Sequence, residues 1–236
     1  MRTFWILLMT GAVALHAVPA VAYEAGEVKN GGTIAGVAIF DGQPPSPKKL
    51  AVTKDQEVCG TEKIAEDLVV GADGKIAHVV VSLTDVKKGK KMGDAAPVLD
   101  QRGCRYLPHV LLVPAGSTVK VLNNDGILHN VHTYARKNQP VNIAQPKFKK
   151  EITTEFEEPE LVSVKCDTHE WMSGVIVVMD HPYYATSDET GAFRLTDVPP
   201  GEYSLKAWHE KLGEKLVKVK VEAGTETRVE LKLGGK

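Results

Sequence analysis

The sequence predicts an all-β protein built from two small β-sandwiches. Short runs of β-branched residues recur along the 236-residue chain, separated by clusters of Gly, Pro, Asn and Asp. Residues 118–122, 161–165 and 218–222 alternate in polarity, as strands with one buried and one solvated face do. No long amphipathic helix is predicted, although residues 57–68 are expected to hold a turn or two.

The amino-acid composition indicates a globular protein and argues against one that binds nucleic acid. Apolar residues make up 43% of the chain and charged residues 25%, which is typical of a globular fold and not of disorder or a coiled coil. Lys plus Arg is 29 and Asp plus Glu is 30, so the formal charge is −1. A neutral balance offers no overall attraction to nucleic acid or to an anionic membrane, and no nucleic-acid partner is expected.

The first 22 residues have the pattern of an export signal. Arg2 precedes an apolar run over residues 4–15, and small residues end the segment at Ala22, where cleavage is expected. No other stretch reaches the roughly 18 apolar residues of a membrane-spanning helix. The mature protein is therefore expected in the periplasm, without a membrane span.

The chain has three cysteines, Cys59, Cys104 and Cys166. In an oxidising compartment an odd count leaves one thiol without an internal partner. That thiol must be protected, joined to another chain or bound to a metal.

Residues 166–172 carry the chemistry that distinguishes this sequence. Between two predicted strands, Cys166, His169 and Met172 place a thiolate, an imidazole and a thioether on one short loop. His129, after the polar turn of residues 123–126, offers a second imidazole. Copper suits this donor set, because thiolate and imidazole form a strong trigonal set to which a thioether adds a weak axial contact. Zinc is the main inorganic alternative, but structural zinc sites rarely use Met.

These motifs resemble the cupredoxins, the blue copper proteins, over residues 97–181. The resemblance rests on His-Asn-Val at residues 129–131, on an amicyanin-like Cys-x-x-His-x-x-Met loop, and on Gly-x-Ile-x-Val at residues 174–178. It implies a Greek-key β-sandwich with one type 1 copper ion. The implied metal ligands are His129, Cys166 and His169 in the equatorial plane and Met172 on the axis. It also implies that Asn130 bridges to the ligand loop by hydrogen bonds.

The resemblance implies a carrier of single electrons and not an enzyme. Its partners would be redox proteins such as a cytochrome or a dehydrogenase. In the family the second ligand-loop histidine lies near the surface, which makes His169 the expected point of electron entry and exit. Trp171 either forms part of a docking patch there or packs under the loop.

A disulfide is expected between Cys59 and Cys104 if Cys166 binds copper as the resemblance implies. Closing a loop over the 44 intervening residues stabilises the fold by about 4 kcal/mol in the chain-entropy account, provided the geometry permits the bridge. Two free thiols, the alternative, would be open to oxidation in an exported protein.

The end of the chain resembles a second family. Residues 187–208 are similar to the carboxypeptidase regulatory-like, or transthyretin-like, β-sandwich, a resemblance that bears on fold and not on function. Residues 182–236 are too few for a complete sandwich of this kind. We expect residues 27–96 to supply its N-terminal part, with the copper domain inserted and Cys59–Cys104 tying host to insert. The alternative is that residues 27–96 pack on the copper domain.

Two further functions stay open on the sequence. One is a protein that stores or delivers copper, for which a more exposed and exchangeable site is expected. The other is an enzyme with a non-blue copper centre, in which Glu170 or His132 replaces Met172 and leaves a ligand position free. His109 and His132 are expected to be structural, with a further metal site as the alternative.

Overall fold

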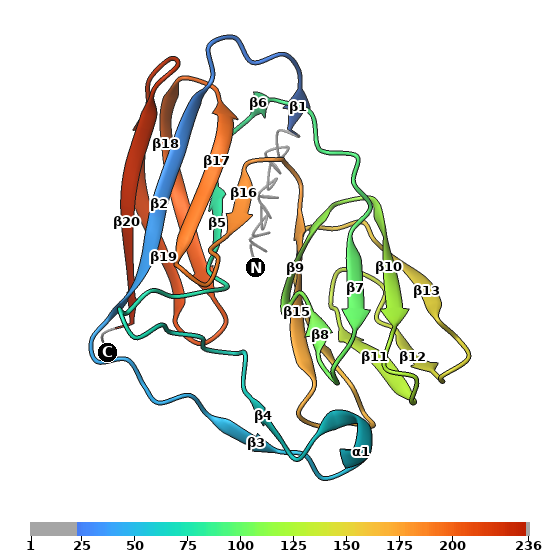
Figure 1. Ribbon diagram of the computed structural model, residues 1–236. Coiled ribbons are helices and arrows are strands. Elements are labelled where there is room, and N and C mark those ends of the chain that lie inside the picture. The colour runs from blue at the N-terminus through green and yellow to red at the C-terminus, as the bar shows by residue number, and fades with distance from the viewer. Residues whose placement is uncertain (1–22, 235–236) are drawn as a thin grey trace, which may run out of the picture.

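The structure, a computed structural model, describes residues 23–234 and is almost entirely β (Figure 1). The expected export signal and its cleavage position after Ala22 lie outside the described residues. Within residues 23–234 no helix has the length and apolarity needed to cross a bilayer. The all-β class expected from the sequence is confirmed, with two β-sandwiches side by side in Figure 1.

The first sandwich consists of a four-stranded and a five-stranded sheet. The four-stranded sheet has the order β13 (Glu151–Phe156), β10 (Ser117–Asn123), β7 (Val98–Gln101), β8 (Tyr106–Leu107). The five-stranded sheet has the order β12 (Asn142–Gln145), β11 (His129–Tyr134), β14 (Leu161–Lys165), β15 (Ser173–Met179), β9 (Val110–Pro114). The pairs β7–β10 and β9–β15 are parallel, and the other pairs in the two sheets are antiparallel.

Alternating side chains fix the register of these strands. In β14, Val162 and Val164 are buried while Leu161, Ser163 and Lys165 are exposed. A shift of one residue would expose both valines, so burial of one face specifies the pairing of β14 with β11 and β15. The core between the two sheets includes Leu99, Phe156 and Ile176, all but inaccessible to solvent.

The second sandwich also has two sheets. One has the order β16 (Tyr184–Thr186), β5 (Val80–Leu83), β18 (Gly201–His209), β19 (Gly213–Val221). The other has the order β17 (Ala192–Val198), β2 (Gly32–Asp41), β20 (Glu226–Gly234). A further short parallel pair joins β1 (Glu24–Ala25) to β6 (Lys88–Gly89).

Strands from both ends of the chain pair in this second sandwich. β2 lies between β17 and β20, and β5 lies between β16 and β18. A Cβ at Gly36 of β2 would lie 2.1 Å from the carbonyl oxygen of Val229, so glycine permits the close approach of β2 to β20. The chain leaves the second sandwich after β5, builds the first and returns at β16. These pairings support the insertion hypothesis, while the boundaries at residues 97 and 182 stay predictions.

Residues 48–66, which we term the strap, run outside both sandwiches. The strap contains β3 (Lys49–Ala51), the short helix α1 (Gln56–Cys59) and β4 (Glu62–Ile64), and β3 pairs with β4. Figure 1 shows it crossing from the second sandwich to the lower end of the first. A disulfide between Cys59 and Cys104, as expected from the sequence, holds the strap there. Part of the segment 27–96 therefore packs against the first sandwich.

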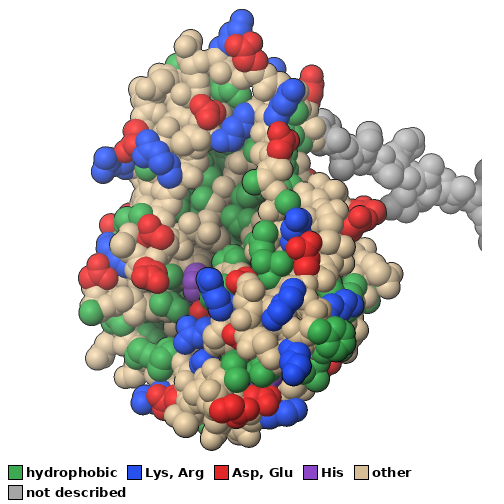
Figure 2. All heavy atoms as spheres, turned by 45° about the vertical axis from the view of Figure 1, so that its right-hand side comes forward, with side chains coloured by type: hydrophobic (Ala, Val, Ile, Leu, Met, Phe, Trp, Pro, Cys, Tyr) green, Lys and Arg blue, Asp and Glu red, His purple; other side chains and the backbone are tan. Residues whose placement is uncertain are grey.

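A third apolar cluster lies where the two sandwiches meet. Val80 and Trp208 of the second sandwich face strands β9 and β15 of the first, where Val110, Val175 and Val177 are buried. The His109 ring adds a hydrogen bond to the Glu210 carboxylate across this junction. On the face shown in Figure 2, basic and acidic side chains are interspersed, in keeping with the near-neutral composition.

Candidate metal centre

A polar turn positions His129 at the first residue of β11. The Asn123 side chain donates hydrogen bonds to the carbonyls of Ile127 and Gln145, both at 2.8 Å, and accepts one from the Asp125 backbone N–H at 3.2 Å. Gly126 takes a positive φ of 73° within the same turn. The turn thus starts β11 with the His129 side chain directed into the sandwich, fully buried.

The loop of residues 166–172 joins β14 to β15. Its ends are held by a hydrogen bond from the Cys166 N–H to the Met172 carbonyl at 3.2 Å and one from the Met172 N–H to the His169 carbonyl at 2.9 Å. The pairing of Lys165 with Ser173 closes the loop at its base. A loop this tightly closed holds Cys166 and His169 in fixed positions.

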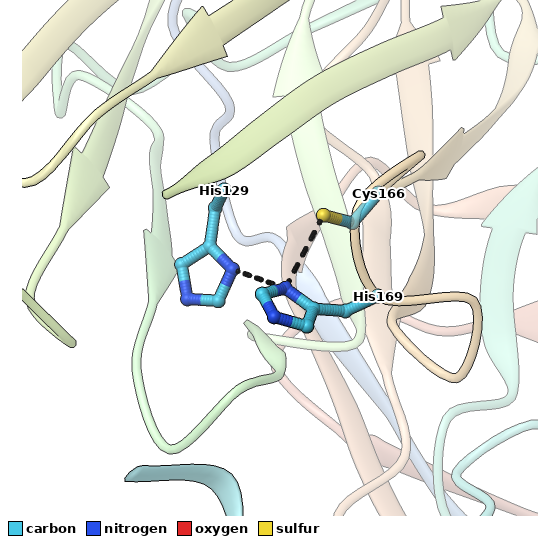
Figure 3. Close-up of side chains that lie close together, drawn as sticks. All are labelled: His129, Cys166 and His169. Carbon is cyan, nitrogen blue, oxygen red and sulfur yellow. Dashed lines mark hydrogen bonds between the residues drawn. The ribbon is translucent and has the colours of Figure 1, made fainter. Parts of the chain in front are cut away.

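Three donor atoms converge between this loop and β11 (Figure 3). The Nδ1 atoms of His129 and His169 lie 2.9 Å apart, and the Cys166 Sγ lies 3.7 Å from the His169 Nδ1. The exposed fraction is 0% for both histidines and 3% for the cysteine. The structure therefore brings together the three residues that the sequence suggested as strong metal ligands.

A carboxylate accepts a hydrogen bond from Nε2 of each imidazole, the ring nitrogen that does not face the other donor atoms. His129 donates from Nε2 to Asp125 Oδ2 at 2.9 Å, and His169 donates from Nε2 to Asp55 Oδ2 at 2.8 Å. Because an ionised carboxylate only accepts hydrogen bonds, the ring proton of each neutral imidazole lies on Nε2. Both Nδ1 atoms then present lone pairs to each other, and this arrangement requires a cation between them, either a proton or a metal ion.

Electrostatics favour the thiolate form of Cys166. Burial raises the pKa of its thiol, but polar contacts with the His129 and His169 rings and hydrogen bonds from backbone N–H groups lower it, to about 6. The thiolate is the form of cysteine that binds metals. Sulfur is thus a third electron-pair donor at the point where the two Nδ1 atoms meet.

The spacing of the donors fits one metal ion. A nitrogen ligand lies about 2.0 Å and a thiolate sulfur about 2.3 Å from zinc, so two nitrogens on one such ion are at most about 4 Å apart and a nitrogen and a sulfur at most about 4.3 Å. The separations of 2.9 Å and 3.7 Å fall within these limits. The donor set is therefore compatible with a first-row metal ion in chemistry and in reach.

Asn130 links β11 to the ligand loop. Its Oδ1 accepts a hydrogen bond from the Asp167 N–H at 2.5 Å, and its Nδ2 donates to Asn142 at 2.8 Å and to Asp167 at 3.2 Å. Its own carbonyl accepts the Tyr106 hydroxyl at 2.5 Å. These are bridging contacts of the kind that the resemblance implied for this residue.

Met172 and Trp171 complete the loop. Met172 is buried in the core of the first sandwich, with 1% of its surface exposed, and its role as an axial ligand stays a prediction. Trp171 is half-buried, donates from Nε1 to the Cys104 carbonyl at 3.2 Å and lies with its ring 5.0 Å from that of His169. Its place in a docking patch likewise stays a prediction.

The expectation that His169 lies near the surface is wrong. Its side chain has no exposed surface, because the strap covers this end of the sandwich and places Asp55 against Nε2. Sequence reasoning missed both Asp55 and Asp125. Asp125 lies four residues before His129 in a recognisable polar turn, whereas Asp55 lies 114 residues from His169 and no local pattern marks it.

Other potential ligands lie apart from this centre. His109 bonds to Glu210 at the junction of the sandwiches, and His132 bonds to Asp167 Oδ1 at 2.9 Å. Within residues 23–234 neither histidine belongs to a group of three donor residues. A second group joins Cys104 and Asp125 to His129, but the Cys104 sulfur is in a disulfide and is not a thiolate.

Comparison with known proteins gives two partial similarities. A sequence profile of the carboxypeptidase regulatory-like domain matches residues 162–234, a range that begins inside β14 of the first sandwich. No curated protein sequence matches the chain.

Solved structures resembling this chain include several of amicyanin. One is a Cu(I) form of an amicyanin variant, which is 26% identical and matches 38% of this chain and 87% of its own, with a TM-score of 0.33. Another is a reduced Cu(I) form at pH 4, 27% identical over the same shares with the same score. A purple cupredoxin from Nitrosopumilus maritimus is 23% identical and matches 36% of this chain and 100% of its own, with a TM-score of 0.31.

Proposed function

We propose that the protein binds one copper ion at His129, Cys166 and His169, with Met172 as a weak fourth ligand, and carries single electrons between redox proteins. The observation that carries this proposal is the meeting of three possible metal-ligand atoms, two imidazole nitrogens and one cysteine sulfur, in a buried space. Two imidazoles, one thiolate and a nearby thioether are a donor set suited to copper in either oxidation state.

A bound copper ion would supply a one-electron couple between Cu(I) and Cu(II). The chain itself holds its donors rigidly: β11 and the loop of residues 166–172 are joined through Asn130, and the carboxylates of Asp55 and Asp125 fix the imidazoles. Little rearrangement is then expected on electron transfer. Full burial of both histidines excludes water from the donors.

Burial of the site favours electron transfer over copper delivery or catalysis. An exchangeable delivery site needs access for a second protein's ligands, and an open catalytic centre needs a position for a small molecule. Cys166, His129 and His169 are all at most 3% exposed. An electron can be transferred through the packed side chains around the site, whereas an ion or a substrate can reach it only if those side chains move.

The place of action that we propose is the periplasm. The Cys59–Cys104 disulfide supports it, because such bridges form and persist in oxidising compartments. The N-terminal pattern of residues 1–22 is the sequence feature that agrees with export. The partners that we propose are other redox proteins, such as a cytochrome or a dehydrogenase.

The test is the visible and electron paramagnetic resonance spectrum of the protein loaded with Cu(II). A covalent bond from copper to the Cys166 thiolate is expected to give an intense blue absorption, which Cys166→Ala abolishes and Met172→Ala alters. His132→Ala, which removes a nearby histidine outside the donor group, is the matched control and is expected to stay blue. A colourless wild type, or colour that persists in Cys166→Ala, would overturn the proposal.

A further inference from the structure

Two carboxylates that the sequence did not indicate contact the donor imidazoles on their outer sides. Asp125 lies in the turn before β11, and Asp55 lies in the strap, immediately before α1. Asp55 occupies the N-cap position of α1 but makes no side-chain hydrogen bond to that helix. Its carboxylate instead accepts the Nε2–H of His169, so the side chain serves the donor group and not the helix.

Asp125 is fixed by the backbone beside the disulfide. Its two carboxylate oxygens accept hydrogen bonds from the N–H groups of Gly103 at 2.5 Å and Cys104 at 2.8 Å. Only 6% of its side chain is exposed, against 30% for Asp55. The Cys104 N–H bonds to Asp125, and Cys59 ends the helix that follows Asp55. The Cys59–Cys104 disulfide therefore connects the surroundings of the two carboxylates.

The negative charges close to the site would change the relative stability of the two oxidation states of a bound copper ion. With both imidazoles neutral, the Cys166 thiolate and the two carboxylates carry three negative charges, which attract a divalent ion more strongly than a monovalent one. A carboxylate that accepts the outer N–H of a ligand imidazole also makes its other nitrogen a stronger donor. Both effects favour the divalent state.

We infer that Asp55 and Asp125 are positioning residues that stabilise Cu(II) relative to Cu(I), and so lower the reduction potential of the site. The inference rests on the proposed copper site. Asp125 has the larger effect, because its charge is less exposed to solvent. The strap, through Asp55, is thereby part of the redox site and not merely a cover over it.

The direct test is the reduction potential of Asp55→Asn, Asp125→Asn and the double variant. Asparagine keeps an acceptor oxygen but removes the charge. Asp125→Asn is expected to lower the preference for Cu(II) over Cu(I) by about tenfold, which is a potential about 59 mV higher, and Asp55→Asn is expected to raise the potential by less. Glu170→Gln is the matched control, because it removes an exposed charge from the ligand loop, and within the described residues Glu170 makes no hydrogen bond to either imidazole. Its shift is expected to be much smaller.

The outcomes separate this inference from the proposed function. If the wild type is blue and neither aspartate variant raises the potential, or if Glu170→Gln raises it equally, the inference is wrong and the copper site stands. A wild type without the blue absorption contradicts the copper site itself.

A second readout does not need the metal. In the metal-free protein the Nε2 protons of His129 and His169 are expected as far-downfield nuclear magnetic resonance signals, because carboxylates hold them. Asp55→Ala should remove only the His169 signal and Asp125→Ala only the His129 signal. Absence of both signals from the folded wild type would overturn the inference even if the asparagine variants fail to fold.

Discussion

Asp55 and His169 lie 114 residues apart in the chain, yet their side chains meet at 2.8 Å and close the end of the first sandwich. The contact joins the strap to the ligand loop. Because His169 is fully buried under it, the strap is expected to limit how ions and solvent reach the donor atoms.

Asp55→Ala is expected to speed the loss of copper to a chelator about tenfold, because the change frees the His169 ring and opens a path to the donor atoms. The measurement is the decay of the blue absorption in excess chelator. Glu57→Ala, an exposed acidic residue in the first turn of α1, is the matched control and should leave the rate near that of the wild type. Equal rates in all three proteins would show that the strap does not limit access.

The disulfide is expected to stabilise the fold substantially. Cys59 and Cys104 are 45 residues apart in the sequence, and closing a loop of that length is worth about 4 kcal/mol in the chain-entropy account. The double variant Cys59→Ser, Cys104→Ser should lose this amount in urea unfolding of the metal-free protein. The wild type treated with a reductant should lose the same amount, and a loss below about 1 kcal/mol in both would contradict the prediction.

The donor group itself was predictable because its spacing is local. Cys166, His169 and Met172 lie on one seven-residue loop, and His129 follows a polar turn with its own pattern. A tight loop between two strands keeps such residues together whatever the rest of the fold does. Sandwich strands were likewise predictable from alternation, as Val162 and Val164 illustrate.

The outer contacts of the site were not predictable from the sequence. Asp55 reaches His169 from a strap that a disulfide and the buried Val52 hold across the end of the sandwich, and neither Asp55 nor His169 shows this in its own sequence neighbourhood. The family resemblance gave the opposite expectation, a histidine near the surface, because it covers residues 97–181 and says nothing of the strap. Contacts between segments far apart in the sequence depend on the tertiary structure, and local secondary-structure propensity carries no information about them.

Asn130→Ala is expected to weaken the connection between β11 and the ligand loop. The Asp167 N–H loses its acceptor, and a hydrogen-bonding group left unpaired in a partly buried place costs about 1–3 kcal/mol. The free energy of unfolding of the metal-free protein should fall by about that amount, and the copper hyperfine splitting in the loaded protein should change. Asn142→Ala removes only side-chain contacts, one of them to Asn130, and leaves the Asp167 N–H with its acceptor, so its effect should be smaller. If the two variants behaved alike, Asn130 would not be a specific link.

His209, near the junction of the sandwiches, is expected to make the free energy of unfolding depend on pH. It ends β18 with 1% of its surface exposed, and its Nε2 has no hydrogen-bond partner in the part of the chain that the structure describes. Burial lowers its pKa to about 4, with His78 and His109 adding to the shift and Glu210 opposing it.

The sign of the effect follows from linkage. The ordinary histidine pKa is about 6.5. Between pH 6.5 and pH 4 the His209 side chain is therefore protonated in the unfolded chain but stays mostly neutral in the folded protein. The contribution of His209 is complete above pH 6.5 and falls by about 3 kcal/mol as the pH drops to 4. His209→Gln cannot titrate, and its free energy of unfolding should therefore fall less steeply over this range than that of the wild type. Carboxylates protonate in both proteins and cancel in the difference, so parallel curves would mean that His209 does not titrate abnormally in the folded state.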